Sequence, residues 1–178
     1  MAQRTTRRIA AALGTLVVAV SMTACAGRPG TAATVGPDQI SVTEVQQTTD
    51  ALTELYGPVP GMSSFVLNVK MRASAAEQVA AAEHLDLRAA AEQALSAQGA
   101  PAGGDVPSVL REFALNATEV DVLQTSVGPE SLAASFAKIP VTVNPRYGLT
   151  GLEAMRFDES QRPLVANPSL SKPDGATQ

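Results

Sequence analysis

Two side chains that often do chemistry in proteins occur once each in this chain of 178 residues, the thiol of Cys25 and the imidazole of His84. A single histidine excludes the His pairs of many metal sites and proton relays. Glu83 and Asp86 beside His84 could take part in acid/base chemistry, but a lone histidine on an alanine-rich helix is more often a surface residue. The sequence also contains neither a GxSxG motif nor a phosphate-binding GK[ST] loop. We therefore expect no enzyme activity.

The first 24 residues have the order of a secretory signal peptide. Arginines at positions 4, 7 and 8 precede an apolar run over residues 9–20, and small residues follow up to Ala24. The run is too short to span a bilayer comfortably, because a transmembrane helix needs about 20 apolar residues. We predict export and cleavage after Ala24. The arginine pair Arg7 and Arg8 leaves both the general and the twin-arginine route open.

Cys25 follows this segment directly. The sequence Met22, Thr23, Ala24, Cys25 resembles the lipobox of bacterial lipoproteins, with Met where Leu is usual. The alternative is a secreted protein with an incidental thiol, but exported chains seldom keep one unpaired cysteine without a use for it. The resemblance implies that Cys25 is lipid-modified and holds the mature chain at the extracytoplasmic face of the cell membrane. Stable anchoring takes two or more acyl chains.

Charge and aromatic content limit the partners and the core. The chain has 13 Lys and Arg against 17 Asp and Glu. The charged residues of the predicted signal peptide are all arginines, so the mature chain is more acidic than the whole sequence. An acidic chain without a Lys/Arg cluster is poorly suited to phosphate backbones, so we expect no nucleic-acid binding. Four Phe, two Tyr and no Trp leave the core to Leu, Val, Ile and Ala. We expect a thin helical scaffold that needs no metal or other cofactor.

Hydrophobic spacing and chain breakers divide the mature sequence into three parts. Residues 25–32 form a lipidated tether, residues 33–148 a domain, and residues 149–178 a tail that we expect to be largely disordered. Within the domain, helical spacing predicts five helices, over about residues 42–55, 63–85, 87–98, 105–127 and 130–138. Ser41 and Glu44 form a capping box at the start of the first helix, whose apolar stripe includes Val45, Leu52 and Leu55. The second helix is expected to bury a single face, with Arg72 facing away, and that face consists of Phe65, Val66, Val69, Ala73, Ala76, Val79 and Ala80. Asp105 and Pro107 are expected to open the fourth helix.

Short β-segments flank these helices. Residues 33–35 predict a strand, residues 36–38 a turn, and residues 40–42 a return strand. Residues 139–143 alternate β-branched side chains and are followed by Asn144 and Pro145, which end the strand. The predicted fold is mainly α, with a small β element that pairs the segment near 33–40 with the strand near 139–143.

This layout resembles actinobacterial lipoproteins that contain a SurA-type chaperone N-terminal domain. The resemblance rests on the opening AATVGPDQISVTEV and on a late motif, and it covers about residues 33–148. The late motif consists of Asn144, Pro145, Arg146, Tyr147 and Gly148. Members of this family often have an aromatic and acidic pair after the glycine, whereas Leu149, Thr150 and Gly151 follow here. The resemblance implies a helical chaperone domain, without the parvulin isomerase domain for which residues 99–105 leave no room.

Two functions follow as expectations. The first is a chaperone-like holdase that binds unfolded exported polypeptides between its long helices, with Met62, Phe65, Val69 and Phe113 as candidate contacts. The second is a structural adaptor that binds one specific envelope protein. An apolar helical stripe more often packs within its own core, and we favour packing over binding for Arg146 and Tyr147 as well.

Overall fold

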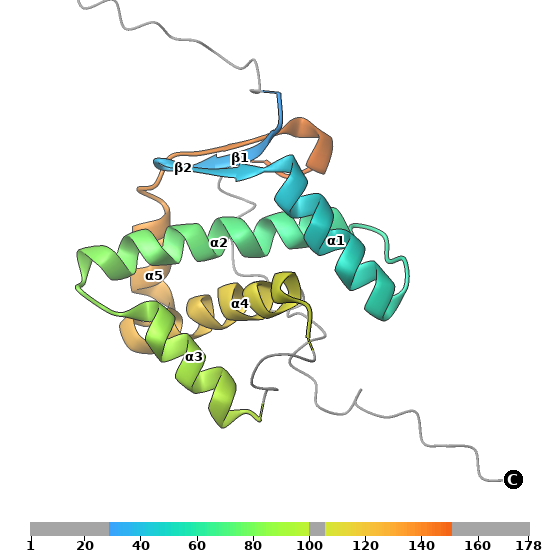
Figure 1. Cartoon of the computed structure of the whole chain (residues 1–178). Helices are drawn as coiled ribbons and strands as arrows, with labels where there is room; N and C mark the ends of the chain where they lie inside the picture. Colours follow the sequence, from blue (N-terminus) through green and yellow to red (C-terminus); the bar gives the residue numbers. More distant parts are fainter. Residues whose placement is uncertain (1–28, 100–105, 151–178) are drawn as a thin grey trace, which may run out of the picture.

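The computed structural model describes residues 29–99 and 106–150, so the predicted signal peptide and the tail from residue 151 lie outside the described residues. Within them the chain forms five α-helices, three strands and one short 3-10 helix (Figure 1). The elements are β1 (Thr31–Val35), β2 (Asp38–Ser41), α1 (Val42–Tyr56), α2 (Met62–Ala82), α3 (Leu87–Ala97), α4 (Ser108–Val127), α5 (Pro129–Phe136), β3 (Val141–Val143) and η1 (Pro145–Tyr147). The predicted mainly α class with a small β element is confirmed.

The sheet joins the two ends of the domain. Its order is β2-β1-β3, and β1 pairs antiparallel with both neighbours. The predicted pairing of the first and last β-segments is therefore confirmed, with Thr34 opposite Thr142. The predicted strand 139–143 is too long at its start, because Pro140 has no amide hydrogen to donate to a ladder. Its carbonyl instead accepts a hydrogen bond from Gly36 N at 2.8 Å.

Helix α1 starts at the predicted capping box. Glu44 N donates to Ser41 Oγ at 3.0 Å, and Ser41 N donates to Glu44 Oε2 at 2.9 Å. Val45 and Leu52 of the predicted apolar stripe are buried, but Leu55 is 61% exposed. The last turn of α1 leads into the α1–α2 connection at the edge of the molecule (Figure 1), where no neighbouring helix covers this part of the stripe.

Helix α2 is the central element of the fold. It lies between the sheet and α1 on one side and α3 and α4 on the other (Figure 1), and it contacts α1, α4, α5, β1 and β2. Its buried residues therefore include Leu67, Met71 and Ala75 in addition to the single face that the spacing predicts. Arg72, which we expected to face away, is half-buried. The helix ends at Ala82 rather than near residue 85, because His84 adopts a left-handed φ of 57°.

The remaining helices pack beneath α2. Asp86 caps α3 by accepting a hydrogen bond from Ala89 N at 3.1 Å. Pro107 stands at the N-cap of α4 and makes no side-chain cap, while the predicted cap residue Asp105 lies outside the described residues. Helix α5 has Pro129 in its first turn, directly after Gly128. The shared core is mainly aliphatic, as the composition predicts, with Leu67, Met71, Leu123 and Leu132 fully buried.

Candidate functional site

The four predicted peptide contacts do not form a groove between the long helices. Val69 is 6% exposed and Phe113 is 2% exposed, so both belong to the core. Phe65 packs edge to face on Phe113, with 5.7 Å between the ring centroids. Because α2 and α4 pack directly on each other, their apolar faces fill the space in which we expected a client. We therefore withdraw Val69 and Phe113 as peptide contacts, whereas Met62 lines a surface depression.

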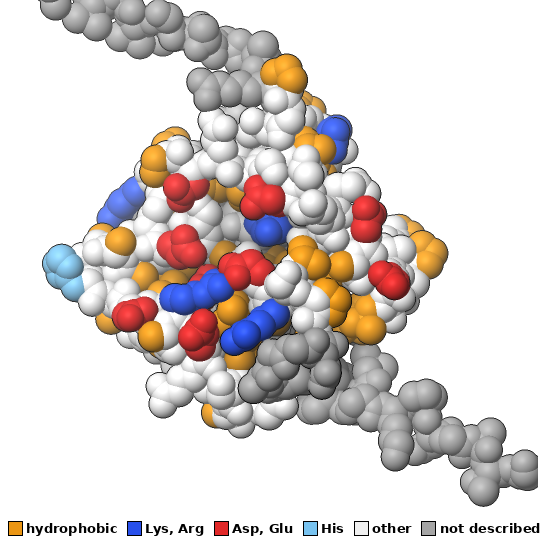
Figure 2. All heavy atoms as spheres, viewed as in Figure 1, with side chains coloured by type: hydrophobic (Ala, Val, Ile, Leu, Met, Phe, Trp, Pro, Cys, Tyr) orange, Lys and Arg blue, Asp and Glu red, His pale blue; other side chains and the backbone are white. Residues whose placement is uncertain are grey.

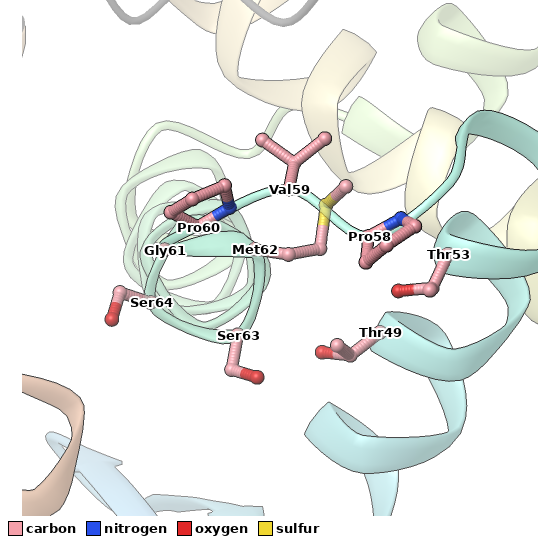
Figure 3. A pocket seen from close by; sticks show the side chains of 9 residues that line it. All are labelled: Thr49, Thr53, Pro58, Val59, Pro60, Gly61, Met62, Ser63 and Ser64. Carbon is pink, nitrogen blue, oxygen red and sulfur yellow. The ribbon is translucent and has the colours of Figure 1, made fainter.

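That depression lies between α1 and the start of α2 and has a volume of about 520 Å³. We call it the α1–α2 hollow. It is lined by Thr49, Thr53, Pro58, Val59, Pro60, Gly61, Met62, Ser63 and Ser64. In Figure 3 the Met62 side chain extends into the space between the first turn of α2 and Pro58, and Val59 and Pro60 border it on the same side. One side of the hollow is therefore apolar and formed by a single connection.

The shape of this connection follows from its breakers. Gly57 ends α1 with a φ of 81°, and Gly61 starts α2 with a φ of 80°. Pro58 and Pro60 lack amide donors, which prevents the segment from continuing either helix. The only apolar side chain between the two prolines, Val59, is 46% exposed. Tyr56, directly before Gly57, is 47% exposed, and together with Val59 it forms an exposed apolar rim on this connection.

Hydroxyl groups line the opposite side of the hollow. Thr49 is 8% exposed, and its Oγ1 is buried without a hydrogen-bond partner among the described residues. Figure 3 shows the side chains of Thr49 and Thr53 directed from α1 toward the first turn of α2, with Ser63 facing Thr49. A buried hydroxyl without a partner costs about 1–3 kcal/mol relative to a satisfied one. The hollow thus combines an apolar wall with a polar group that is not satisfied within the described fold.

The late motif predicted from the sequence has a packing role. Asn144 N donates to Ala32 O at 2.8 Å and Asn144 Nδ2 donates to Thr31 O at 3.3 Å, which joins the motif to β1. Tyr147 is 7% exposed, and its ring and hydroxyl are covered by Arg146, whose Nη2 lies 3.0 Å from Tyr147 Oη. Tyr147 is therefore packed, whereas Arg146 is exposed and contacts the Tyr147 ring from outside. Pro145 begins η1, and Gly148 ends it with a left-handed φ of 65°.

A second unusual site lies between α3 and α4. Arg88 binds both carboxylate oxygens of Glu112, at 2.9 and 2.5 Å, and its Nη1 also lies 3.2 Å from Glu119 Oε1. We call these three residues the Arg88 cluster. Figure 2 shows acidic and basic side chains gathered on the face that α3 and α4 form below α2. Two carboxylates and one guanidinium make this an acidic cluster whose charges mainly bind each other.

Burial sets the electrostatics of the cluster. Glu119 is fully buried, and burial raises its pKa despite the hydrogen bond from Arg88. The hydrogen bond from Arg88 has the opposite effect on the more exposed Glu112 and lowers its pKa. On α2, burial and the nearby Asp38 raise the pKa of Glu77. The arrangement fixes α3 against α4 and offers no open space for a substrate.

The other chemistry-bearing residues are not brought together. His84 is exposed in the α2–α3 connection, with Asp86 engaged as the cap of α3. Among residues 29–99 and 106–150, no three His, Cys, Asp or Glu side chains form a group that could hold a metal ion. None of the helices in these ranges combines the length and apolar character that a membrane span requires. Ala24 and Cys25 lie outside the described residues.

Of the residues that line the hollow, only Met62 was predicted from the sequence as a contact, and no residue of the Arg88 cluster was predicted as a site. The signal for the hollow is an apolar valine between two prolines and two glycines, where a solvent-exposed connection would normally be polar. The signal for the cluster is Glu119, a charged residue at a position of α4 whose helical neighbours Leu115 and Leu123 are buried. The pairing of Thr49 with Ser63 has no local signal, because it depends on how two helices cross.

Comparison of the chain with known protein families, with curated proteins and with solved structures finds no match.

Proposed function

We propose that this protein is a lipid-anchored, extracytoplasmic chaperone-like module, which holds extended segments of unfolded exported proteins in the α1–α2 hollow and performs no isomerisation. The main support is Thr49, whose buried Oγ1 has no hydrogen-bond partner among the described residues and which lines the same hollow as the apolar Val59 and Met62. An extended polypeptide supplies what such a site lacks, because it presents backbone N–H and C=O groups next to apolar side chains.

The same geometry favours weak binding of many sequences over tight binding of one. Burying one or two client side chains against Met62 and Val59 contributes about 2 kcal/mol each. Part of this gain is offset by the loss of translational and rotational freedom on association. A Kd between about 0.1 and 1 mM corresponds to a net of only about 4 to 5.5 kcal/mol. Flexible Met62 can also adapt its shape to different partners.

The anchor and the family resemblance support the location and the class of this activity. Cys25 precedes β1 by only a few residues, so a lipid on Cys25 would keep the domain at the membrane surface, where exported chains emerge unfolded. The similarity to SurA-type chaperone domains fits a β-element that closes a helical domain. Loss of radiolabelled palmitate incorporation in Cys25→Ser cells, with the wild-type chain labelled, would support the anchor. Equal labelling of both would overturn it.

Binding at the hollow is tested with a permanently unfolded, reduced and carboxymethylated protein as the client. We expect Val59→Ser to weaken its binding about tenfold, because about 1.5 kcal/mol of apolar burial is lost. Leu85→Ser is the matched control, since Leu85 is 42% exposed against 46% for Val59. It lies after the far end of the 21-residue helix α2, about 30 Å away at about 1.5 Å per residue. Equal effects of the two variants would contradict the hollow as the site.

Thr49→Val distinguishes a binding role of the hydroxyl from a folding role, because the variant should bind clients more weakly without being less stable. Removing a buried hydroxyl that lacks a partner should leave the free energy of unfolding unchanged or raise it by up to about 1 kcal/mol. Client affinity should fall, because the hydrogen bond to the bound chain is lost. A variant that is as stable as the wild type and binds equally well would remove the observation on which the proposal depends.

The alternative function, an adaptor for one envelope protein, is distinguished by the range of partners. Crosslinking in intact cells should give many different exported proteins on the wild-type chain and fewer on Val59→Ser. One partner at equal stoichiometry, recovered from both variants, would favour the adaptor.

A further inference from the structure

We infer that the tail of the same chain, through its first apolar segment at residues 151–157, occupies the α1–α2 hollow when no client is bound. This inference adds regulation to the proposed function and rests on it. Residues 151–178 lie outside the described part of the chain, so the argument depends on where the described chain ends, how far the tail reaches, and which side chains it offers.

The described chain ends beside the hollow. Ser64 is one of the residues that line it, and Ser64 Oγ donates a hydrogen bond to Tyr147 O at 2.6 Å. Tyr147 is buried, and Leu149 still packs against the core. The exit of the tail at Thr150 is therefore held within three residues of a carbonyl that contacts the first turn of α2.

The remaining path is short. In Figure 3, Ser64 points away from α1, so a tail that starts on this side must pass around the first turn of α2 to reach the hollow. A helix with its side chains is about 10 Å across, so the path around half of it is about 16 Å. An extended chain covers about 3.3 Å per residue, so about five residues after Thr150 suffice. Met155 and Phe157 lie five and seven residues after Thr150, which places both within reach.

The first part of the tail has the side chains that the hollow would bind. Residues 151–157 (GLEAMRF) contain Leu152, Met155 and Phe157, and Phe157 is the only aromatic residue after Tyr147. Beyond them the sequence is dominated by polar residues, proline and glycine. The exposed apolar rim of Tyr56 and Val59 would otherwise face water. Covering such a rim with the nearest apolar segment lowers the free energy without any partner.

Tethering makes even a weak contact effective. A short flexible connection gives an effective concentration of about 1 mM, so a segment that binds with a Kd of about 0.1 mM is docked about 90% of the time. A client must then compete with the tail, and its apparent affinity is lowered about tenfold. The tail would thus keep the hollow covered until the local concentration of unfolded segments is high.

The lack of tryptophan in the chain allows a direct test, because Phe157→Trp introduces a single reporter into the full chain, purified in detergent. If the tail docks, its emission shifts to shorter wavelength and acrylamide quenching falls several-fold relative to Leu170→Trp, the matched reporter further along the tail. Adding Val59→Ser to Phe157→Trp should restore the quenching of the Leu170→Trp chain, and adding Leu85→Ser should not.

Three results would overturn the inference. The first is equal quenching of the two reporters. The second is protection of the Phe157→Trp reporter that Val59→Ser leaves unchanged, which would mean that the tail contacts another surface or the detergent. The third is protection that appears only as protein concentration rises, which would mean that the tail binds a second copy. The readout contains no client, so a docked tail in a chain that fails to bind clients would reject the proposed function alone.

Discussion

The α1–α2 hollow and the Arg88 cluster depart from an ordinary protein surface in opposite ways. The hollow and its rim leave apolar side chains in water, with Tyr56 and Val59 both about half exposed. The cluster takes a charge out of water, with Glu119 fully buried beneath Arg88. Exposing an apolar side chain costs the folded state little, whereas removing the partner of a buried charge costs it much. Changes in the hollow should therefore alter binding, and changes in the cluster should alter stability.

The largest loss of stability is expected from a change in the core, which serves as the reference for the two surface regions. Phe113→Ala removes a ring that is 2% exposed and packs on Phe65, and we expect a loss of about 3–5 kcal/mol in the free energy of unfolding. Urea denaturation followed by circular dichroism measures it. After correction for the folded fraction, client binding should be unchanged. Loss of binding with intact stability would instead return Phe113 to the list of peptide contacts.

Arg88→Met should give the next largest effect. It leaves Glu119 buried without its cation, and we expect a loss of about 2–3 kcal/mol, below the full value for a buried pair because Glu119 can take up a proton. Arg111→Met is the matched control on exposed α4 surface and should change stability by less than about 0.5 kcal/mol. Client affinity should be the same for both. A selective loss of binding in Arg88→Met would place the cluster in the site.

A change in the rim of the hollow should have a smaller effect, and it should weaken client binding instead of stability. Tyr56→Ser removes part of an exposed apolar surface, and we expect it to weaken client binding by about 1 kcal/mol, roughly fivefold in Kd. Stability should change by less than about 0.5 kcal/mol, because the Tyr56 side chain is not in the core. Isothermal titration of the unfolded client and urea denaturation measure the two quantities on the same samples. A rim variant that unfolds the protein would contradict the distinction between a hollow that affects binding and a cluster that affects stability.

The pH dependence of Glu119→Gln should be the smallest effect. Burial raises the pKa of Glu119 above the ordinary 4.5, so the wild-type folded state loses stability as pH rises from about 4.5 through the raised value. Glutamine does not titrate, and the stability difference between Glu119→Gln and the wild type should move in favour of the variant over that range. Denaturation at several pH values between 4 and 8 checks the sign. A difference that is constant with pH would contradict the raised pKa.

The sequence predicts the elements of this fold better than their surroundings. The capping box of Ser41 and Glu44 and the five helices follow from local spacing, whereas the pairing of the outer β-segments was expected from the family resemblance. Leu55 shows where this approach fails, because an apolar stripe does not reveal where the neighbouring helix ends. For helix α2 the predicted stripe is too narrow. Leu67 and Met71 lie outside it and are nevertheless buried, because the helix is covered on two sides.

The candidate site could be predicted only in part for the same reason. Met62 was found as an apolar residue at a helix start, but Thr49 looks like an ordinary polar position of α1 until α2 is placed beside it. Val69 and Phe113 were predicted from their apolar character, which is the same for a core and for a binding surface. Which of the two applies depends on contacts between elements that are far apart in the sequence.

The central position of β1 also bears on how the protein forms in the first place. Its second partner, β3, follows more than a hundred residues later, and contacts of such separation form slowly. A chain that crosses a membrane from its N-terminus onward therefore emerges with one edge of β1 open until residues 141–143 arrive. An open strand edge invites pairing with other chains. During the export that we propose, the protein would itself be the kind of extended, aggregation-prone segment that we propose it later holds for others.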